Sequence, residues 1–364
     1  MTRSIFDPVS FACGATSPNG FMLAPLTNGQ SHDDGTLSDA ERRWLVRRAA
    51  GGFGLVSTCA AHVSEDGKGF DGQLGVWGDH QLPGLTTLAA DIAKHGALPI
   101  VQVYHGGARC PSKLTGQQPW SASAFTEDKP GFEVPRAATE ADITGVIARF
   151  GDAAARVRAA GFAGVEVHGA HGYLLSQFLS TAMNTRDDAW GGSLENRARL
   201  VREVTRVSRA RGGDKFLVGV RLSPEDFGFT RGVDLDETVQ VARWLADDGA
   251  DFIHLSLWDV SRMTKKRPDA HPLAVFREAL PGHVRIVAAG KVWTRADAER
   301  CLALGADLVA LGRAGILNPE LPREARDDGW TPRRPPLTPE EYAARDVSPA
   351  FLTYLRRFDG MVAG

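Results

Sequence analysis

The sequence has little cysteine, and what it has is scattered. Its four cysteines, Cys13, Cys59, Cys110 and Cys301, form no C-x-x-C spacing. A zinc knuckle or an iron–sulfur cluster holds its metal through closely spaced cysteines, so neither is indicated. We interpret all four as buried free thiols, the usual state of isolated cysteines.

Long apolar runs and a strong charge bias are also missing. No segment approaches the roughly 18 consecutive apolar residues of a membrane-spanning helix. The opening MTRSIFDPVS lacks the apolar region of a secretion signal. The formal net charge of -2 gives no sign of a nucleic-acid or anionic-membrane surface. These absences predict a cytoplasmic protein that binds neither nucleic acid nor membrane.

What remains is the composition of an ordinary globular enzyme, with 43% hydrophobic and 24% charged residues in 364. Short apolar runs alternate with helix-like patterns along the whole chain. The candidate strands are Phe21–Ala24, Leu55–Thr58, Pro99–Val103, Val165–His168, Leu217–Leu222, Phe252–Leu255, Arg285–Ala288 and Leu308–Leu311. One uninterrupted α/β series of this length favours a single (β/α)8 TIM barrel. A doubly wound sheet is the alternative, but no G-x-G-x-x-G follows the first strand.

Helix-start signals fall between these strands. Ser38 and Glu41 form a capping-box pattern, and Thr139, Ser193 and Thr294 precede further helical stretches. The Pro-, Gly- and Ser-rich stretch from 105 to 138 is predicted to be a long loop over the top of the barrel, after strand three.

The part after Leu321 begins with a proline- and arginine-rich segment and ends in SPAFLTYLRRF. We expect a barrel over residues 1–321. Residues 322–364 are then an extension with a short terminal helix, packed on the barrel or on a neighbouring subunit.

The fourth strand ends in a cluster of proton-carrying side chains. Because side chains alternate along a strand, Glu166 and His168 should point into the barrel while the intervening valines face the helices. His171, Tyr173 and Gln177 follow directly. Two imidazoles and a phenol suit a reaction that builds negative charge on a carbonyl oxygen and then needs a proton. The alternatives are hydrogen-bonded loop histidines, or an H-x-x-H metal site without an evident third ligand.

Two further patterns lie at other strand ends. Gly290 follows strand seven, and Gly312 with Arg313 follows strand eight. These are the loops with which barrels often bind phosphate, although either glycine alone is more often a turn residue. Gln102 and Arg221 are polar residues inside apolar strands. Gln102 could hydrogen-bond the amide-like edge of a ligand, and Arg221 could neutralise developing negative charge. Alternatively, Arg221 could form an ion pair with Glu166.

The run VEVHGAHGYLLSQFLSTAMNTRDDAWGGSLENR resembles the signature of the old yellow enzyme family of flavin-dependent ene-reductases. The resemblance extends from the APLT run at Ala24–Thr27 to the ALGR run at Ala310–Arg313. It implies one FMN across the mouth of the barrel, reduced by NADPH or NADH. The implied cofactor-binding residues are Ala24, Pro25, Leu26, Thr27, Ala60, Gln102, Arg221, Gly290, Gly312 and Arg313.

The same resemblance implies a catalytic set. His168 and His171 would bind the carbonyl oxygen of an activated alkene, and Tyr173 would protonate its α-carbon after hydride reaches the β-carbon. It also implies a homo-oligomer, in which Tyr354 or Arg356 could enter a neighbouring active site. Two other functions remain open from the residues: a flavin-free metal hydrolase or aldolase that uses the histidines, and a flavin-binding redox module without alkene turnover.

Overall fold

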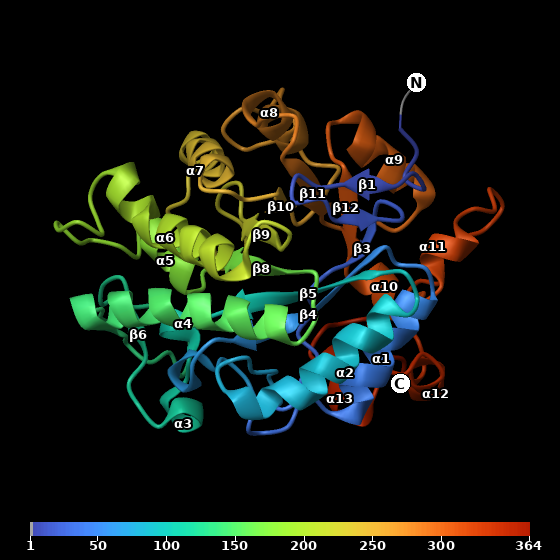
Figure 1. The fold of residues 1–364 in the computed structure, drawn as a ribbon, viewed down its shortest axis with the longest axis horizontal. Helices are drawn as coiled ribbons and strands as arrows, with labels where there is room; N and C mark the ends of the chain where they lie inside the picture. Colours follow the sequence, from blue (N-terminus) through green and yellow to red (C-terminus); the bar gives the residue numbers. More distant parts are fainter. Residues whose placement is uncertain (1–2) are drawn as a thin grey trace.

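A closed barrel of parallel strands forms the centre of the protein (Figure 1). The computed structural model describes residues 3–364. The barrel strands are β3 (Phe21–Leu23), β4 (Leu55–His62), β5 (Leu98–Tyr104), β8 (Gly164–Gly169), β9 (Leu217–Leu222), β10 (Phe252–Ser256), β11 (Arg285–Ala289) and β12 (Leu308–Leu311). Pairing of β12 with β3 closes the ring. Each strand overlaps a predicted one, although most differ from the prediction at one or both ends, and the TIM-barrel prediction is confirmed.

Helices follow the strands and form the outer layer of the barrel. They are α1 (Asp39–Ala50), α2 (Leu82–Ala93), α4 (Glu140–Ala159), α6 (Leu194–Gly212), α7 (Leu235–Asp247), α8 (Pro272–Ala279), α9 (Arg295–Ala303) and α10 (Arg313–Leu317). The short α5 (Leu174–Leu179) lies between β8 and α6, and two single turns, η1 (Glu65–Gly67) and η2 (Asp79–Gln81), lie between β4 and α2. Within residues 3–364 none of the helices has the length and apolarity needed to cross a membrane.

The predicted helix starts are confirmed, with one correction. Ser38, Thr139, Ser193 and Thr294 each accept a hydrogen bond from the backbone three residues on. The capping box predicted at Ser38 is wrong in its second half, because the Glu41 side chain does not return to the cap. It turns inward, is fully buried, and accepts hydrogen bonds from Asn28 and Ser31 in the loop after β3.

Side-chain alternation divides the apolar residues into two cores. Val165 and Val167 of β8 pack outward against the helices, as predicted, whereas Glu166 points inward. A second cluster around Phe252 fills the interior of the barrel. A hairpin of β1 (Val9–Ser10) and β2 (Thr16–Ser17) closes its amino-terminal end, where the Phe11 ring lies 6.0 Å from that of Phe252. The sequence had given no indication of this hairpin.

The segment from 105 to 138 is more ordered than its composition predicted. It contains η3 (Gly107–Arg109), α3 (Ser112–Thr115) and a small sheet of β6 (Trp120–Ser121) and β7 (Arg136–Ala137). The prediction of a loop lying over the top of the barrel is wrong at Trp120, which is 2% exposed and belongs to the main core cluster. Gln177, first grouped with the catalytic side chains, holds this segment instead. Its amide contacts the Ala108 backbone, the Ser121 hydroxyl and two backbone carbonyls.

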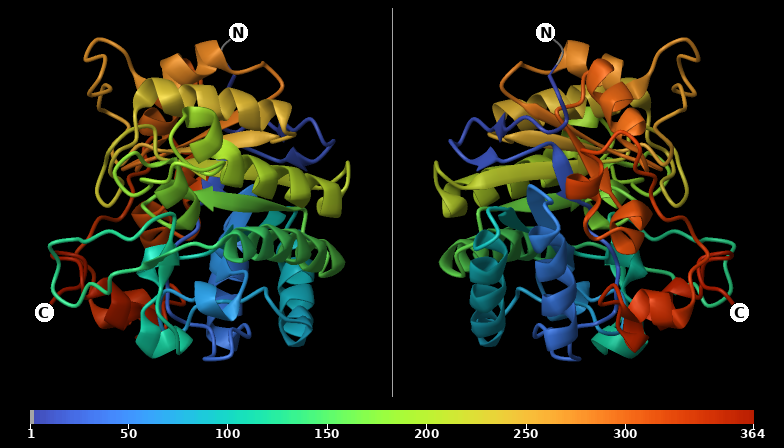
Figure 2. Two further views of the ribbon diagram at one scale, coloured as in Figure 1. Left: turned by 90° about the vertical axis from the view of Figure 1, so that its left-hand side faces the viewer. Right: turned by 90° about the vertical axis from the view of Figure 1, so that its right-hand side faces the viewer.

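The tail folds back along the first helix. It contains α11 (Leu321–Glu324), α12 (Pro339–Ala343) and α13 (Pro349–Leu355). The Phe351 ring packs edge-on against Trp44 of α1, with 5.3 Å between ring centroids. Both views of Figure 2 show the red tail and the green segment after β5 on the same side of the molecule.

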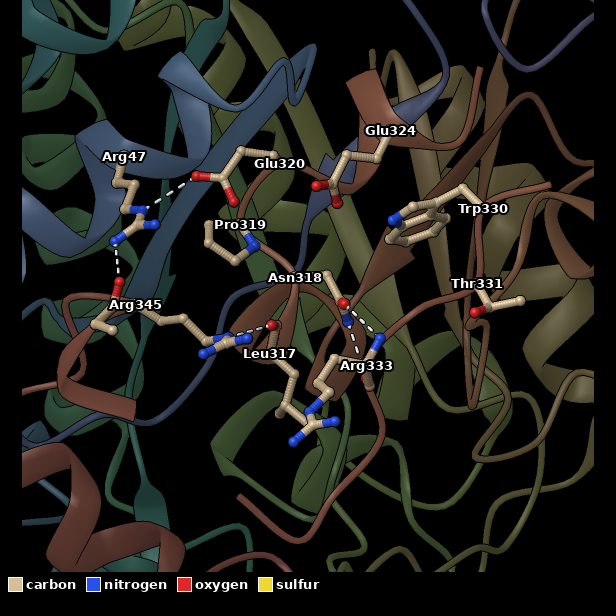
Figure 3. A pocket seen from close by; sticks show the side chains of 11 residues that line it. Arg47, Leu317, Asn318, Pro319, Glu320, Glu324, Trp330, Thr331, Arg333 and Arg345 are labelled. Carbon is tan, nitrogen blue, oxygen red and sulfur yellow. Dashed lines mark hydrogen bonds and ion pairs between the residues drawn. The ribbon is translucent and has the colours of Figure 1, made fainter. Parts of the chain in front are cut away.

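A polar cavity of about 290 Å³ marks the seam between the tail and the barrel (Figure 3). Most of its charged groups are engaged with one another or with backbone. Arg47 of α1 contacts Glu320 and the Ala344 carbonyl, while Arg345 donates to the Leu317 carbonyl. These contacts anchor the tail to the end of α1 that leads into β4.

Candidate active site

Two adjoining cavities lie at the carboxyl ends of the barrel strands. One has a volume of about 380 Å³ and runs from β3 to the ends of β11 and β12. The other, of about 370 Å³, extends towards the ends of β5 and β8. Leu26, Arg221, Ser256 and Trp258 are among the residues that line both, so the two form one continuous site. All of the catalytic and cofactor-binding residues that the family resemblance implied line one of these cavities, whereas Gln177 lines neither.

His168, His171 and Tyr173 converge on the second cavity. The ring centroids of the two histidines are 5.0 Å apart, and the Tyr173 ring lies 5.1 Å from His168. His168 is the second-last residue of β8, whereas His171 lies two positions past the strand and has a left-handed backbone conformation with φ of 61°. This conformation reverses the chain locally and brings His171 close to His168.

Hydrogen bonds within the protein engage one ring nitrogen of each histidine. The Ala170 N–H donates to His168 Nδ1 at 3.3 Å, which leaves the proton on Nε2. Arg221 and His171 Nε2 both contact the Ser256 hydroxyl, at 3.3 and 2.6 Å. A hydroxyl can accept two hydrogen bonds as well as donate one, so both tautomers of His171 are compatible with this contact. Each neutral ring offers one N–H donor.

Desolvation controls the protonation of this cluster. Burial lowers the pKa of His168 and of His171 well below the usual value, and the nearby Arg221 reinforces the effect. Burial raises the pKa of Tyr173, while Arg109 works in the opposite direction. At neutral pH the site consequently holds two neutral imidazoles and a protonated phenol.

We expect the free energy of unfolding to fall as the pH drops from 7.5 to 5.5. Burial lowers the folded-state pKa of His62 to about 4 and also lowers those of His168 and His254. Below a pH of about 6.5 the unfolded chain takes up protons that the folded rings exclude, so stability is lost by up to roughly 1.4 kcal/mol per histidine per pH unit. Urea unfolding at the two pH values measures this, and an unchanged free energy would contradict the neutral histidines.

A buried polar network lies beneath the second cavity. Glu166 accepts a hydrogen bond from Gln102 Nε2 at 2.6 Å and contacts His254 Nδ1 at 2.7 Å. The alternative in which Arg221 forms an ion pair with Glu166 is wrong, because Gln102 and His254 occupy the carboxylate. Arg221 instead approaches Ser256, and its Nε atom is buried without a hydrogen-bond partner among residues 3–364.

The two glycines at the far end of the first cavity have different roles. At Gly290, where φ is 150°, a Cβ would lie 2.8 Å from the backbone nitrogen of Asp259. The turn at Trp258 and Asp259 therefore requires glycine at 290. At Gly312 a Cβ would meet only Leu26, at 3.5 Å, so the space above its backbone is open. Arg313 lies beside Gly312, and its guanidinium packs against Phe358 of the tail.

These two glycines should respond differently to alanine. Gly290→Ala is expected to cost about 1–3 kcal/mol of folding free energy whether or not a ligand is bound, because the strain belongs to the protein itself. Gly312→Ala should leave the apoprotein's stability nearly unchanged. Its methyl group would, however, block the phosphate that the family resemblance places above this backbone, and the loss of charge-assisted hydrogen bonds should weaken binding of the implied FMN roughly ten- to hundredfold. Thermal unfolding of the apoproteins and FMN titrations separate the two effects.

Several residues at the site were not identified from the sequence. His254 lies in a predicted strand, where a polar residue among apolar ones is the signal that points to it. Ser256 and Trp258 follow that strand. Trp258 adopts a φ of 63° and is 62% exposed over both cavities. Tyr354 of α13 lines the second cavity of its own chain, whereas Arg356 is exposed.

The protein is a parallel barrel with a long two-part cavity at its strand ends, lined by proton donors, an amide and a guanidinium. This arrangement is typical of a TIM-barrel enzyme with a ligand-binding cavity across its mouth. Among residues 3–364 no three His, Cys, Asp or Glu side chains gather closely enough to hold a metal ion.

Comparisons with known proteins agree with this class. The sequence model of the NADH:flavin oxidoreductase / NADH oxidase family matches residues 4–329. The chain is 38% identical over 325 residues to a probable NADH-dependent flavin oxidoreductase, YqiG, of Bacillus subtilis (87% of this chain, 86% of that protein). It is 33% identical over 332 residues to an NADPH dehydrogenase of Bacillus licheniformis (89% and 94%). Its fold superposes on an old yellow enzyme homologue from Zymomonas mobilis with a TM-score of 0.81 at 28% identity, covering 93% of this chain and 98% of that one.

The chain belongs to the NADH:flavin oxidoreductase / NADH oxidase family. It is an FMN-dependent, NAD(P)H-linked oxidoreductase of the old yellow enzyme type. The resemblance noted in the sequence is thereby confirmed, as are the cofactors that it implied.

The residues present fit FMN. A flavin needs hydrogen-bonding groups at its pyrimidine edge, room for its ring system and a cradle for its phosphate. The Nε atom of Arg221, which has no partner among residues 3–364, and the carbonyl oxygen of Gln102 could hydrogen-bond the pyrimidine edge. The joined cavities have room for the ring system. The open backbone at Gly312, beside Arg313, could hold the phosphate.

Proposed function

We propose that this protein reduces activated alkenes, above all α,β-unsaturated carbonyl compounds, with NADPH or NADH as the electron source. The observation that carries the proposal is the convergence of two N–H donors and a protonated phenol on one cavity whose floor is lined by Gln102 and Arg221. When bound, FMN supplies the hydride chemistry, taking hydride from the nicotinamide and giving it to the alkene β-carbon.

The cofactor is proposed to lie along both cavities. Ala24, Pro25, Leu26 and Thr27 form one wall, and Ala60 occupies a bulge of β4 that brings it level with Gln102. Gln102 and Arg221 would bind the polar edge of the ring. Gly312 and Arg313 would hold the phosphate, while Gly290 shapes the turn beside them.

His168 and His171 are proposed to bind the substrate carbonyl. His168 Nε2–H is the donor left over by the hydrogen bond from the Ala170 N–H. In this proposal the Ser256 hydroxyl donates to His171 Nε2, and the His171 Nδ1–H is the second donor. Two such donors polarise a carbonyl and stabilise the negative charge that develops on its oxygen. A single positioned donor of this kind is worth about 2.7–4 kcal/mol in a transition state.

Tyr173 is proposed to deliver the proton to the α-carbon. It precedes α5, and its ring packs on Tyr104 with 4.6 Å between centroids. Arg109 donates to the Gly172 carbonyl at 3.1 Å, which fixes the backbone next to Tyr173. A phenol with a raised pKa keeps its proton until a carbanion demands it.

An anaerobic visible spectrum of the purified, FMN-loaded protein tests the proposal. We expect the flavin band to bleach with NADPH or NADH and to return when cyclohexenone is added. A band that bleaches and does not return with any of a panel of enones would contradict alkene reduction, and would favour a flavin-binding redox module instead.

A further inference from the structure

Glu166 is the only carboxylate among the described residues that hydrogen-bonds to both Gln102 and His254. It is 0% exposed and lies under the second cavity, on β8 between β5 and β9. Its two oxygens meet one partner each, Gln102 Nε2 and His254 Nδ1. A buried carboxylate at neutral pH only accepts hydrogen bonds, so it dictates which atom each partner presents.

The first consequence concerns Gln102. An amide can present either its oxygen or its NH₂ group, and the two are hard to tell apart by shape alone. Because Nε2 donates to Glu166, Oε1 is the atom left for the cavity, and it makes no other hydrogen bond among residues 3–364. Gln102 therefore offers an acceptor, which suits an N–H group on the ligand.

The second consequence concerns His254 and Arg221, which are register partners on β10 and β9. With its Nδ1 proton donated to Glu166, neutral His254 has an acceptor at Nε2. That atom and the Arg221 Nε donor are both buried, and neither has a partner among the described residues. Glu166 thus sets the tautomer of the group beside Arg221.

The third consequence is electrostatic. Burial works to raise the pKa of Glu166, but His254 and Arg221 outweigh it, and the net shift is downward. Burial lowers the pKa of His254, which keeps its ring neutral. One positive and one negative charge remain in this layer, so Glu166 offsets the charge of Arg221.

We propose that Glu166 is a positioning residue for the flavin: it fixes the Gln102 amide with its oxygen towards the cofactor and moderates the pull of Arg221 on the reduced ring. The proposal rests on the placement of FMN given under the proposed function. Glu166 does not itself line the cavity, and it acts through Gln102, His254 and Arg221.

The experiment compares the FMN midpoint potential of wild type, Glu166→Gln and Glu166→Asp. Removing the negative charge should favour reduced FMN over oxidised FMN by about tenfold in binding, which is a potential about 30 mV more positive. Glu166→Asp keeps the charge at a shorter reach. Its potential should stay near that of wild type, even if FMN binds more weakly in both redox states.

Asp251→Asn is the matched control. Asp251 is also buried and ion-paired, with Arg209, but it precedes β10 and lies at the amino-terminal end of the barrel. The Asp251→Asn substitution should lower the melting temperature without changing the FMN midpoint potential. An unshifted potential in Glu166→Gln, or an equal shift in Asp251→Asn, would overturn the proposal while leaving FMN binding and alkene reduction intact. Failure of wild type to bind FMN would instead contradict the proposed function.

A measurement on the wild-type fold covers the case in which Glu166→Gln does not fold. Nitrogen-15 NMR of histidine-labelled holoprotein, with His254 assigned by the difference from His254→Gln, should show the Nδ1–H tautomer at neutral pH. An Nε2–H tautomer would overturn the proposal, because Glu166 would then no longer receive the His254 proton.

Discussion

Replacing Tyr173 with phenylalanine should slow alkene reduction by about 10²–10⁴-fold, the usual contribution of a positioned general acid. The reduction of FMN by NAD(P)H should remain nearly unchanged, because that half-reaction needs no proton from the phenol. The ring packing on Tyr104 and His168 survives the substitution, so the cavity keeps its shape. Stopped-flow absorbance at the flavin band measures each half-reaction separately.

Tyr104→Phe is the matched control for this prediction. Tyr104 has the same phenol side chain, and its ring centroid lies 4.6 Å from that of Tyr173. Tyr104 is buried, however, and does not line the cavity that the two histidines line. Its loss should leave both half-reactions close to wild type. Equal slowing of the two half-reactions in Tyr173→Phe would show that Tyr173 shapes the cavity and does not donate the proton.

Replacing Arg221 with methionine should weaken the binding of reduced FMN more than that of oxidised FMN. Methionine fills similar volume without a charge, so the loss isolates the guanidinium. A charged hydrogen bond is worth about 1.5–3 kcal/mol, which corresponds to roughly 10- to 150-fold in affinity. Titration of the apoprotein with oxidised FMN, combined with the midpoint potential, gives both affinities.

Arg221→Lys separates charge from shape at the same position. Lysine retains the positive charge but not the planar fork that reaches Ser256 and the cavity together. It should restore most of the preference for reduced FMN and only part of the total affinity. If lysine and methionine reduce both affinities equally, the charge of Arg221 has no part in favouring the reduced cofactor.

The barrel could be predicted from the sequence because its signals are local. Strand periodicity and helix caps depend on residues within one turn or one strand, and a run such as Val165–His168 reveals which face is buried. The strand-end positions of His168, Gly290 and Gly312 follow from the same reasoning, because parallel strands bring their carboxyl ends to one face. This is why the residues predicted for cofactor binding and catalysis lie together around the two cavities.

Partners across the barrel could not be predicted in the same way. Arg221 and His254 are both near Glu166, and only the side-chain geometry shows that the His254 imidazole forms the hydrogen bond with the Glu166 carboxylate. Glu41 likewise has a capping position by sequence, yet burial and two loop donors draw it inward. Such choices depend on residues far apart in the chain, for which no local pattern exists.

The closure of the barrel between β12 and β3 joins residues almost 300 positions apart, since Leu311 pairs with Leu23. On the ribosome, therefore, the ring stays open until residue 311 has been made, and the Tyr354 wall of the cavity arrives later still. The cradle at Gly312 and Arg313 is completed at nearly the same moment as the ring. Cofactor capture should thus be a late event in biogenesis, and nascent chains that end before this point should remain flavin-free and dependent on chaperones.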